Sequence, residues 1–345
     1  MTHVLVARLD SDGDVLLMGP AIRAVAARAK RVTLLCGPRG RQAAELLPGV
    51  DELVVYRAPW IDPDPGPVER DDVLRLVDRL AGLEVDEAIV LTSFHQSPLP
   101  LALLLRLAGT GSIAAISPDY PGSLLDIRHR VPDDLHEVER ALSLVAALGY
   151  ELPAADTGAL EVVRRPEARP RELPEEPYVV VHPGASVPAR AWAPERFAEL
   201  VAALVDQRRA VVVTGGPAEA ALTARVARPR PDDVIDLGGR TDLAGLAEVL
   251  AAAEVLVVGN TGPAHVAAAV KTPVVSLFAP TVPAARWHPW GTPHILLGRQ
   301  DIGCAGCRAK VCPFEGHPCL DGVPVEQVLD AVETLAPSRV PELAA

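Results

Sequence analysis

The feature that most constrains this chain is a regular alternation of short apolar runs with longer segments of helical period. HVLVARL at 3–9 precedes a helical segment at 15–29, RVTLLC precedes another at 39–47, and the succession continues to about residue 148. Apolar runs rich in β-branched residues indicate buried strands, and apolar residues at helical spacing indicate helices that cover them. Strands and helices that alternate in this way predict a parallel sheet wound on both faces.

The alternation stops once and then begins again. The stretch at 164–177, RRPEARPRELPEEP, mixes prolines with charged residues, which excludes a continuous helix or a central strand. From YVVVHPG onward the alternation resumes, and a chain of this length normally needs two cores. We therefore expect an N-terminal domain at 1–165, a linker at 166–177, a C-terminal domain at 178–323, and a segment at 324–345 whose helix packs back on the first domain.

Charge and hydropathy exclude several classes of protein. The apolar runs are six to eight residues long, whereas crossing a bilayer takes roughly 20. No basic segment precedes the first apolar run, so we expect a cytoplasmic protein without a secretory signal, with attachment to the inner membrane face left open. The net charge of -12 argues against nucleic acid as a partner. The first strand-to-helix turn lacks G-x-G-x-x-G, which disfavours a nicotinamide cofactor.

Three carboxylates lie in that first turn, where ligands of such sheets bind. Asp10, Asp12 and Asp14 stand within five residues, and Gly13 permits a tight backbone turn. One interpretation is helix capping by Asp14. The other is that a carboxylate accepts a proton from an attacking hydroxyl. Three acids exceed what capping requires, so we favour Asp14 as a base and keep Asp10 and Asp12 as alternatives.

The second half offers candidate groups for a phosphate at the corresponding turns. After VVVH come small residues with Ser186, and then Arg190, whose planar fork of donors suits phosphate oxygens. A surface arginine beside a packing Trp192 is the alternative. The run VVGNTGPAH at 257–265 leads from a strand into an Ala-rich helix, and the free amides and dipole at such a helix start attract anions.

Two side chains near these turns are candidates with simpler alternatives. His265 lies in the first turn of the Ala-rich helix, where its imidazole can donate to a phosphate, although a structural role is the common one for a single histidine. Glu219 follows TGGP at 214–217 and can accept hydrogen bonds from ribose hydroxyls, although a solvated helix position would explain it equally.

Taken together and in order, these motifs resemble glycosyltransferase family 9, which includes the bacterial heptosyltransferases of lipopolysaccharide core synthesis. The resemblance covers nearly the whole chain. It rests on R-x-x-x-x-G-D-V-L-L-x-x-P at 8–20, HPGAS at 182–186 with Arg190 and Trp192, TGGP at 214–217 with Glu219, GR-x-x-L at 239–243, GN-x-GP-x-H at 259–265 and TPVVSLFAPT at 272–281.

The resemblance implies a GT-B architecture, an α/β fold of two Rossmann-like doubly wound parallel-sheet domains facing across a cleft. It also implies an inverting glycosyltransferase that needs no cofactor or divalent metal for catalysis. The donor would be ADP-heptose or a related nucleotide sugar, and the acceptor a hydroxyl of a glycan, a glycolipid or a small metabolite.

Carried over by position, the resemblance assigns catalytic roles to Asp14 as base and Arg190 at the phosphates. The substrate-binding set that it implies is Gly13, Ser186, Glu219, Asn260, Thr261, Gly262 and His265. Asn260 is a departure, since many relatives have aspartate there, and donor or acceptor contacts would differ accordingly. Acceptor contacts would come from first-domain loops near 58–69 and 94–100, of which the first is acidic and poorly suited to a phosphorylated lipid core.

Four of the five cysteines cluster near the C-terminus, and they also recur in many relatives. Cys304, Cys307, Cys312 and Cys319 have a spacing that suits a structural zinc ion held by four thiolates. Free thiols or disulfides formed on isolation are the alternatives.

Two other functions remain compatible with the sequence. A nucleotide-sugar epimerase would use the same double fold and a diphosphate site but no acceptor. A nucleotide-sugar-binding protein without transfer activity would fit Asn260, whereas Asp14 and Arg190 argue against it.

Overall fold

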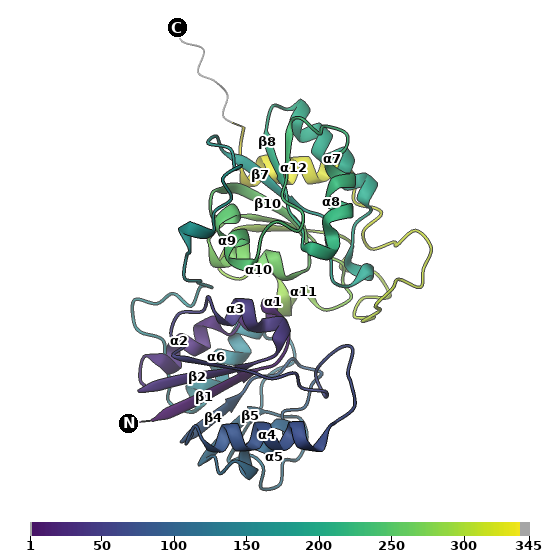
Figure 1. Cartoon of the computed structure of the whole chain (residues 1–345). Helices are drawn as coiled ribbons and strands as arrows, with labels where there is room; N and C mark the ends of the chain where they lie inside the picture. The colour runs from purple at the N-terminus through teal and green to yellow at the C-terminus, as the bar shows by residue number, and fades with distance from the viewer. Residues whose placement is uncertain (1, 339–345) are drawn as a thin grey trace. The chain divides into compact units, whose positions relative to one another are not determined.

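The computed structural model describes residues 2–338 and divides into two compact units that meet at Val163 and Arg164 (Figure 1). Each unit contains one six-stranded sheet in which every strand pairs parallel to its neighbours. The parallel sheets explain why the strands read as continuous apolar runs, because helices cover both faces.

The first unit has the strand order β3-β2-β1-β4-β5-β6. These strands are β1 (His3–Arg8), β2 (Arg31–Cys36), β3 (Glu52–Val55), β4 (Glu87–Val90), β5 (Ser112–Ile116) and β6 (Ile127–His129). Its helices are α1 (Asp12–Leu16), α2 (Gly19–Ala26), α3 (Arg41–Ala44), α4 (Arg70–Ala81), α5 (Leu99–Leu107) and α6 (Glu137–Ala147), with a 3-10 turn η1 (Pro38–Gly40). Helices α4 and α5 cover one face of the sheet, and α2 and α6 lie on the other (Figure 1).

The second unit repeats this arrangement with the order β12-β11-β10-β7-β8-β9. Its strands are β7 (Tyr178–His182), β8 (Ala210–Val213), β9 (Val234–Asp236), β10 (Ala253–Gly259), β11 (Val274–Leu277) and β12 (His294–Leu297). Its helices are α7 (Pro194–Asp206), α8 (Ala220–Ala227), α9 (Leu243–Ala251), α10 (Gly262–Ala269), α11 (Ala284–Trp287) and α12 (Val325–Leu335). Three 3-10 turns accompany them, η2 (Pro166–Ala168), η3 (Pro188–Arg190) and η4 (Pro217–Glu219).

Helix α12 belongs to the core of the second unit. Its apolar residues Val325, Val328, Ala331 and Val332 are buried together with Leu204 of α7 and with the strands beneath. We expected this helix to pack back on the N-terminal domain, whereas its apolar face is buried in the second core; residues 339–345 of that segment lie outside the described residues. The amphipathic spacing of α12 indicates a buried face, but it does not specify which of two cores receives that face.

Both sheets reverse their order of winding at one point, between β1 and β4 in the first unit and between β7 and β10 in the second. The order is the doubly wound one, in which ligands bind beyond the carboxyl ends of the strands at this switch point. The turns that follow β1, β4, β7 and β10 are therefore the places where each unit is expected to bind ligands.

Within residues 2–338, no helix combines the length and the apolar character that a membrane-crossing helix requires.

Candidate functional site

A buried arginine organises the acidic turn that follows β1. The Arg8 side chain is 1% exposed and pairs with three carboxylates. Its Nε lies 2.8 Å from Asp10 Oδ2, its Nη2 lies 3.1 Å from Asp14 Oδ1, and its Nη1 lies 3.1 Å from Glu137 Oε2. The group that meets Asp14 also donates to Ser93 Oγ at 2.8 Å. A buried guanidinium is stable only when charge and hydrogen-bond partners surround it. Arg8 therefore holds the turns after β1 and β4 together with the start of α6.

Asp14 both caps a helix and presents a carboxylate at this edge. Ser11 is the N-cap of α1. Its backbone amide donates to Asp14 Oδ2 at 3.4 Å and its hydroxyl donates to the same oxygen at 2.7 Å, while Arg8 contacts the other oxygen. The capping interpretation is thus correct, and it does not exclude the chemical one. The Asp14 side chain is 24% exposed, so a hydroxyl from solution can reach a carboxylate whose orientation is fixed on both sides.

The other two acids of the turn, Asp12 and Asp10, stabilise the local structure. Asp12 Oδ1 accepts a hydrogen bond from the Ala43 amide at 2.8 Å, and burial raises the pKa of Asp12 to about 6. Asp10 pairs with Arg8 and accepts a hydrogen bond from the Gln96 side chain. Burial raises the pKa of Asp10, and the charge of Arg8 opposes that rise. Gly13 is buried inside α1, where its carbonyl accepts from the Leu17 amide at 3.3 Å.

Sequence reasoning missed Glu137, which is as buried as Arg8. It begins α6, 129 residues after its partner, and also lies 3.2 Å from Arg140 Nε. Burial raises the pKa of Glu137, while the charges of Arg8 and Arg140 oppose the shift. The sequence does contain one indication of this pair, because the apolar face of α6 also includes Glu137 and, three residues later, Arg140.

In the second unit, Arg190 ends the 3-10 turn η3 that follows β7. Its Nε donates to Thr281 Oγ1 at 3.0 Å, and the side chain stays partly exposed. The neighbouring Trp192 is 1% exposed and packs edge-on against Phe197 with ring centroids 5.0 Å apart. Trp192 therefore anchors the turn in the core, whereas Arg190 presents its guanidinium at the edge of the sheet. Ser186, earlier in the same turn, is exposed.

The turn with Arg190 lies directly beside the start of helix α10. A Cβ atom placed on Gly259, the last residue of β10, would stand 3.1 Å from the Arg190 carbonyl oxygen. The N-cap of α10 is Thr261, in an extended conformation and without a side-chain capping hydrogen bond, and Gly262 is the first helical residue. The first amides of a helix carry partial positive charge. The backbone of Arg190 thus lies against the strand end that leads into α10, while its guanidinium contacts Thr281.

Two buried polar side chains flank the start of α10. Asn260 is 8% exposed, and its Nδ2 donates to the Ala279 carbonyl oxygen at 3.3 Å, a contact that an ionised aspartate cannot make. Among the described residues, Asn260 Oδ1 has no hydrogen-bond partner. His265 is 7% exposed and lies on the first turn of α10. The hydrogen bond to Ala279 therefore gives a structural explanation for asparagine at position 260 in this chain.

Glu219 lies over the turn after β7, at the edge where Ser186 and Arg190 stand. A Cβ on Gly184 would clash with the Glu219 carboxylate, so a larger residue there would displace this side chain. Glu219 Oε2 accepts from the Gly216 amide at 2.7 Å and lies 3.7 Å from His182 Nε2. Burial lowers the pKa of His182, which sequence reasoning did not single out, and the charge of Glu219 opposes the shift.

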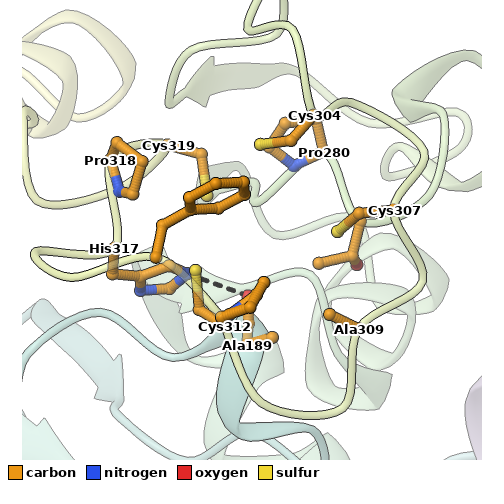
Figure 2. Close-up of a pocket in the computed structure, with 12 residues that line it drawn as sticks. Ala189, Pro280, Cys304, Cys307, Ala309, Cys312, His317, Pro318 and Cys319 are labelled. Carbon is orange, nitrogen blue, oxygen red and sulfur yellow. Dashed lines mark hydrogen bonds between the residues drawn. The ribbon is translucent and has the colours of Figure 1, made fainter.

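The four clustered cysteines line one small pocket of about 20 Å³ beside η3, and their labelled side chains surround it in Figure 2. All are free thiols in the structure. Burial raises the pKa of Cys319 to about 11. Within residues 2–338, no set of three or more histidine, cysteine or acidic side chains is placed to hold a metal ion, so the expected structural zinc has no support in the structure.

The cysteine-rich loop instead supports Arg190 through backbone contacts. The Ala189 amide donates to the Lys310 carbonyl at 3.1 Å, and His317 Nε2 lies 3.0 Å from the Ala189 carbonyl oxygen (Figure 2). The Arg308 amide donates to the carbonyl of Thr281, the residue whose hydroxyl accepts from Arg190. The loop thereby fixes both η3 and the partner of the Arg190 side chain.

Comparison with known proteins identifies the family. Residues 73–317 match the sequence model of glycosyltransferase family 9 (heptosyltransferase), and the chain belongs to this family. It is 30% identical over 215 residues to lipopolysaccharide heptosyltransferase 3 of Escherichia coli K12, an alignment that covers 60% of this chain and 61% of that protein. It is 31% identical over 239 residues to lipopolysaccharide heptosyltransferase 1 of Pseudomonas aeruginosa, covering 67% and 65%. The matches thus span somewhat less than two thirds of these relatives.

Solved structures show the same fold. A family 9 glycosyl transferase from Veillonella parvula superposes with a TM-score of 0.79 at 20% identity, covering 97% of each chain. The E. coli ADP-heptose lipopolysaccharide heptosyltransferase II has a TM-score of 0.76 at 20% identity, covering 97% of this chain and 98% of that one. The expected GT-B fold of two Rossmann-like domains and the family resemblance drawn from the motifs are both confirmed.

Proposed function

We propose that the protein is an inverting glycosyltransferase that moves a heptose or related sugar from a nucleotide diphosphate donor, with ADP-heptose favoured, to a hydroxyl acceptor. Family membership supports the class of reaction, and two of the solved relatives are an E. coli heptosyltransferase with ADP and the same enzyme with a fluorinated ADP-heptose. The observation that carries the proposal for this chain is that the Arg190 backbone lies against Gly259, the residue where β10 ends before α10, at the switch point of the second sheet.

The donor diphosphate would bind at that place. The amides at the start of α10 and the guanidinium of Arg190 supply positive charge and directed donors. Thr261 and His265 add polar groups on the same turn, and Glu219, beside the Gly184 turn, can accept hydrogen bonds from ribose hydroxyls. When the sugar leaves, the diphosphate gains negative charge, and groups already aimed at it stabilise that charge without rearrangement.

The acceptor would be activated by Asp14. Its carboxylate removes the proton of an acceptor hydroxyl, and the hydroxyl oxygen forms a bond to the anomeric carbon on the face opposite the diphosphate. The bond from that carbon to the diphosphate oxygen breaks, the electron pair leaves with the nucleotide, and the configuration inverts. Arg190 and the α10 amides supply the charge stabilisation, so the proposal includes no requirement for a divalent metal.

The test is a comparison of nucleotide binding with sugar transfer on the full chain. We expect ADP to bind more tightly than GDP, UDP or dTDP in isothermal titration, and Arg190→Ala to weaken ADP binding at least tenfold, as loss of a charge-assisted contact does. Arg196→Ala is the matched control, because this α7 arginine is exposed and forms an ion pair with the exposed Glu199. Asp14→Asn should keep ADP binding while lowering transfer about 10²–10⁴-fold.

The outcomes separate the parts of the proposal. If none of the nucleotides binds to the unaltered protein, the donor site is wrong. If Asp14→Asn transfers sugar at the original rate, the base is wrong while the donor site stands.

A further inference from the structure

The first unit contains an apolar pocket that the proposed chemistry does not use. It lies beyond the carboxyl ends of β1 and β4 and has room for about 10 Å³, roughly one water-sized group, and its apolar walls include Leu9, Trp60, Ile61, Pro98 and Leu101. Only uncharged side chains line it. Pockets that bury a whole drug-sized ligand have about 300–1,000 Å³. This one is suited to a single group of a larger molecule.

The walls are held in place before any ligand arrives. Trp60 contacts Tyr56 with ring centroids 6.0 Å apart, and the amides of Ile61 and Asp62 both donate to the Ala58 carbonyl at 3.0 Å. These contacts fix the segment after β3 as a turn over the pocket. Trp60 and Ile61 remain partly exposed although they are apolar, which is typical of a surface that a ligand covers.

The pocket shares a wall with the Asp14 cluster. Gln96 lines it, and the Gln96 amide group donates to Asp10, which pairs with Arg8. Gln96 Oε1 accepts from the Ser93 amide at 3.2 Å, and the Ser93 hydroxyl accepts from the same Arg8 nitrogen that contacts Asp14. Arg8, Ser93 and Gln96 therefore connect the wall of the pocket to the Asp14 carboxylate.

The chemistry of the lining selects the occupant. Both polar ends of Gln96 are engaged, and Ser97 Oγ accepts from the Leu99 amide at 3.4 Å. A phosphate or carboxylate in the pocket would have no cation to pair with, and burying an unpaired charge is strongly unfavourable. A hydroxyl placed against Leu101, Trp60 and Ile61 would lose its water without replacement.

We propose that this pocket is an acceptor subsite that takes a compact, uncharged apolar group next to the reacting hydroxyl, such as the methyl group of a 6-deoxyhexose. The assignment rests on the proposed function, since it makes the occupant part of the sugar acceptor. It distinguishes the acceptor from a sugar that carries phosphate near the reacting hydroxyl.

The experiment uses the full chain with saturating ADP and three matched pairs of sugars, L-rhamnose with L-mannose, L-fucose with L-galactose, and D-quinovose with D-glucose. Saturation-transfer NMR measures which protons contact the protein and gives each dissociation constant. In at least one pair we expect the 6-deoxy sugar to bind about fivefold or more tightly, because burying one methyl gives about fourfold and stranding a hydroxyl adds to it. Its methyl protons should receive the strongest saturation.

Two variants test the location. Ser97→Phe fills the pocket and Trp60→Ala removes a wall, and both should abolish the 6-deoxy preference. Tyr120→Ala is the matched control, because Tyr120 is an aromatic of the same unit that is 84% exposed and does not line the pocket. Circular dichroism confirms that each variant is folded.

Three results would overturn the inference: no preference in any pair, a preference that survives Ser97→Phe, or tighter binding of mannose 6-phosphate than of rhamnose. ADP binding, measured in the same samples, separates the two proposals. Failure of ADP to bind counts against the proposed function, whereas ADP binding without a 6-deoxy preference overturns only the acceptor subsite.

Discussion

Replacing Arg8 with methionine should destabilise the first unit strongly and in a pH-dependent way. The guanidinium and the Glu137 carboxylate are each 1% exposed, so the change leaves Glu137 and Asp10 without their principal counter-charge in a buried place. Removing one partner from a buried ion pair costs about 3–5 kcal/mol. We expect a loss in this range from the free energy of unfolding at pH 8.

The sign of the pH effect follows from the carboxylates. Burial already raises the pKa of Asp10 and of Glu137, and the positive charge of Arg8 is what opposes the rise. Without Arg8, both pKa values in the folded state move further above their unfolded values. The folded variant then binds protons more readily than the unfolded chain, so it is least impaired at low pH and loses stability as pH rises. The cost of Arg8→Met should therefore be clearly smaller at pH 5 than at pH 8.

The assay is urea unfolding of the full chain with hydrogen exchange read on peptides from β1 and β4, which reports the first unit specifically. Arg31→Met serves as control, because this arginine of the same sheet is 51% exposed and its pair with Glu52 should contribute less than about 1 kcal/mol. Adding Glu137→Gln to Arg8→Met should recover part of the loss by removing a stranded charge. The reasoning is refuted if Arg8→Met costs no more than Arg31→Met, or costs the same at both pH values.

Two further predictions concern the second unit and the cysteines. Asn260→Asp should lower the free energy of unfolding by about 1–3 kcal/mol at pH 8, because a buried carboxylate cannot donate to Ala279 as the amide does. Urea titration should show this loss becoming smaller towards pH 5, where the carboxylate binds a proton. A loss that does not change with pH would contradict this. Thiol labelling read by mass spectrometry at pH 8 should modify exposed Cys307 well before Cys36 and Cys319. Burial raises the pKa of Cys36 to about 12 and of Cys319 to about 11, so these thiols react slowly. Early modification of Cys36 in the folded protein would be inconsistent with the structure.

The fold could be predicted because its signal is local and repeated. Each strand is a short apolar run, each helix follows at its own period, and parallel burial on both faces makes the runs continuous, as in β7 where all five residues are buried. The placement of α12 could not be predicted in this way. Its stripe of Val325, Val328 and Val332 requires an apolar partner but is equally compatible with either core.

The same distinction applies to the candidate site. Groups that lie within one turn, such as Ser11 with Asp14 or Thr261 with His265, could be found from their spacing. Their long-range partners could not. Glu137 is separated from Arg8 by 129 residues and Thr281 from Arg190 by 91, and each is an ordinary residue in its own segment. Only the sheet order, which brings distant turns to one edge, makes these pairs neighbours.

The surplus of acids around Arg8 is consistent with the role proposed for Asp14. A salt bridge to a buried arginine favours the ionised form of a carboxylate, which by itself would oppose proton uptake. Asp10 and Glu137 change this balance, because they keep Arg8 paired when Asp14 accepts a proton. The network can therefore orient Asp14 through both oxygens and still let its charge vary without stranding the buried cation. Three carboxylates around one guanidinium would therefore hold the proposed base in position and leave it able to react.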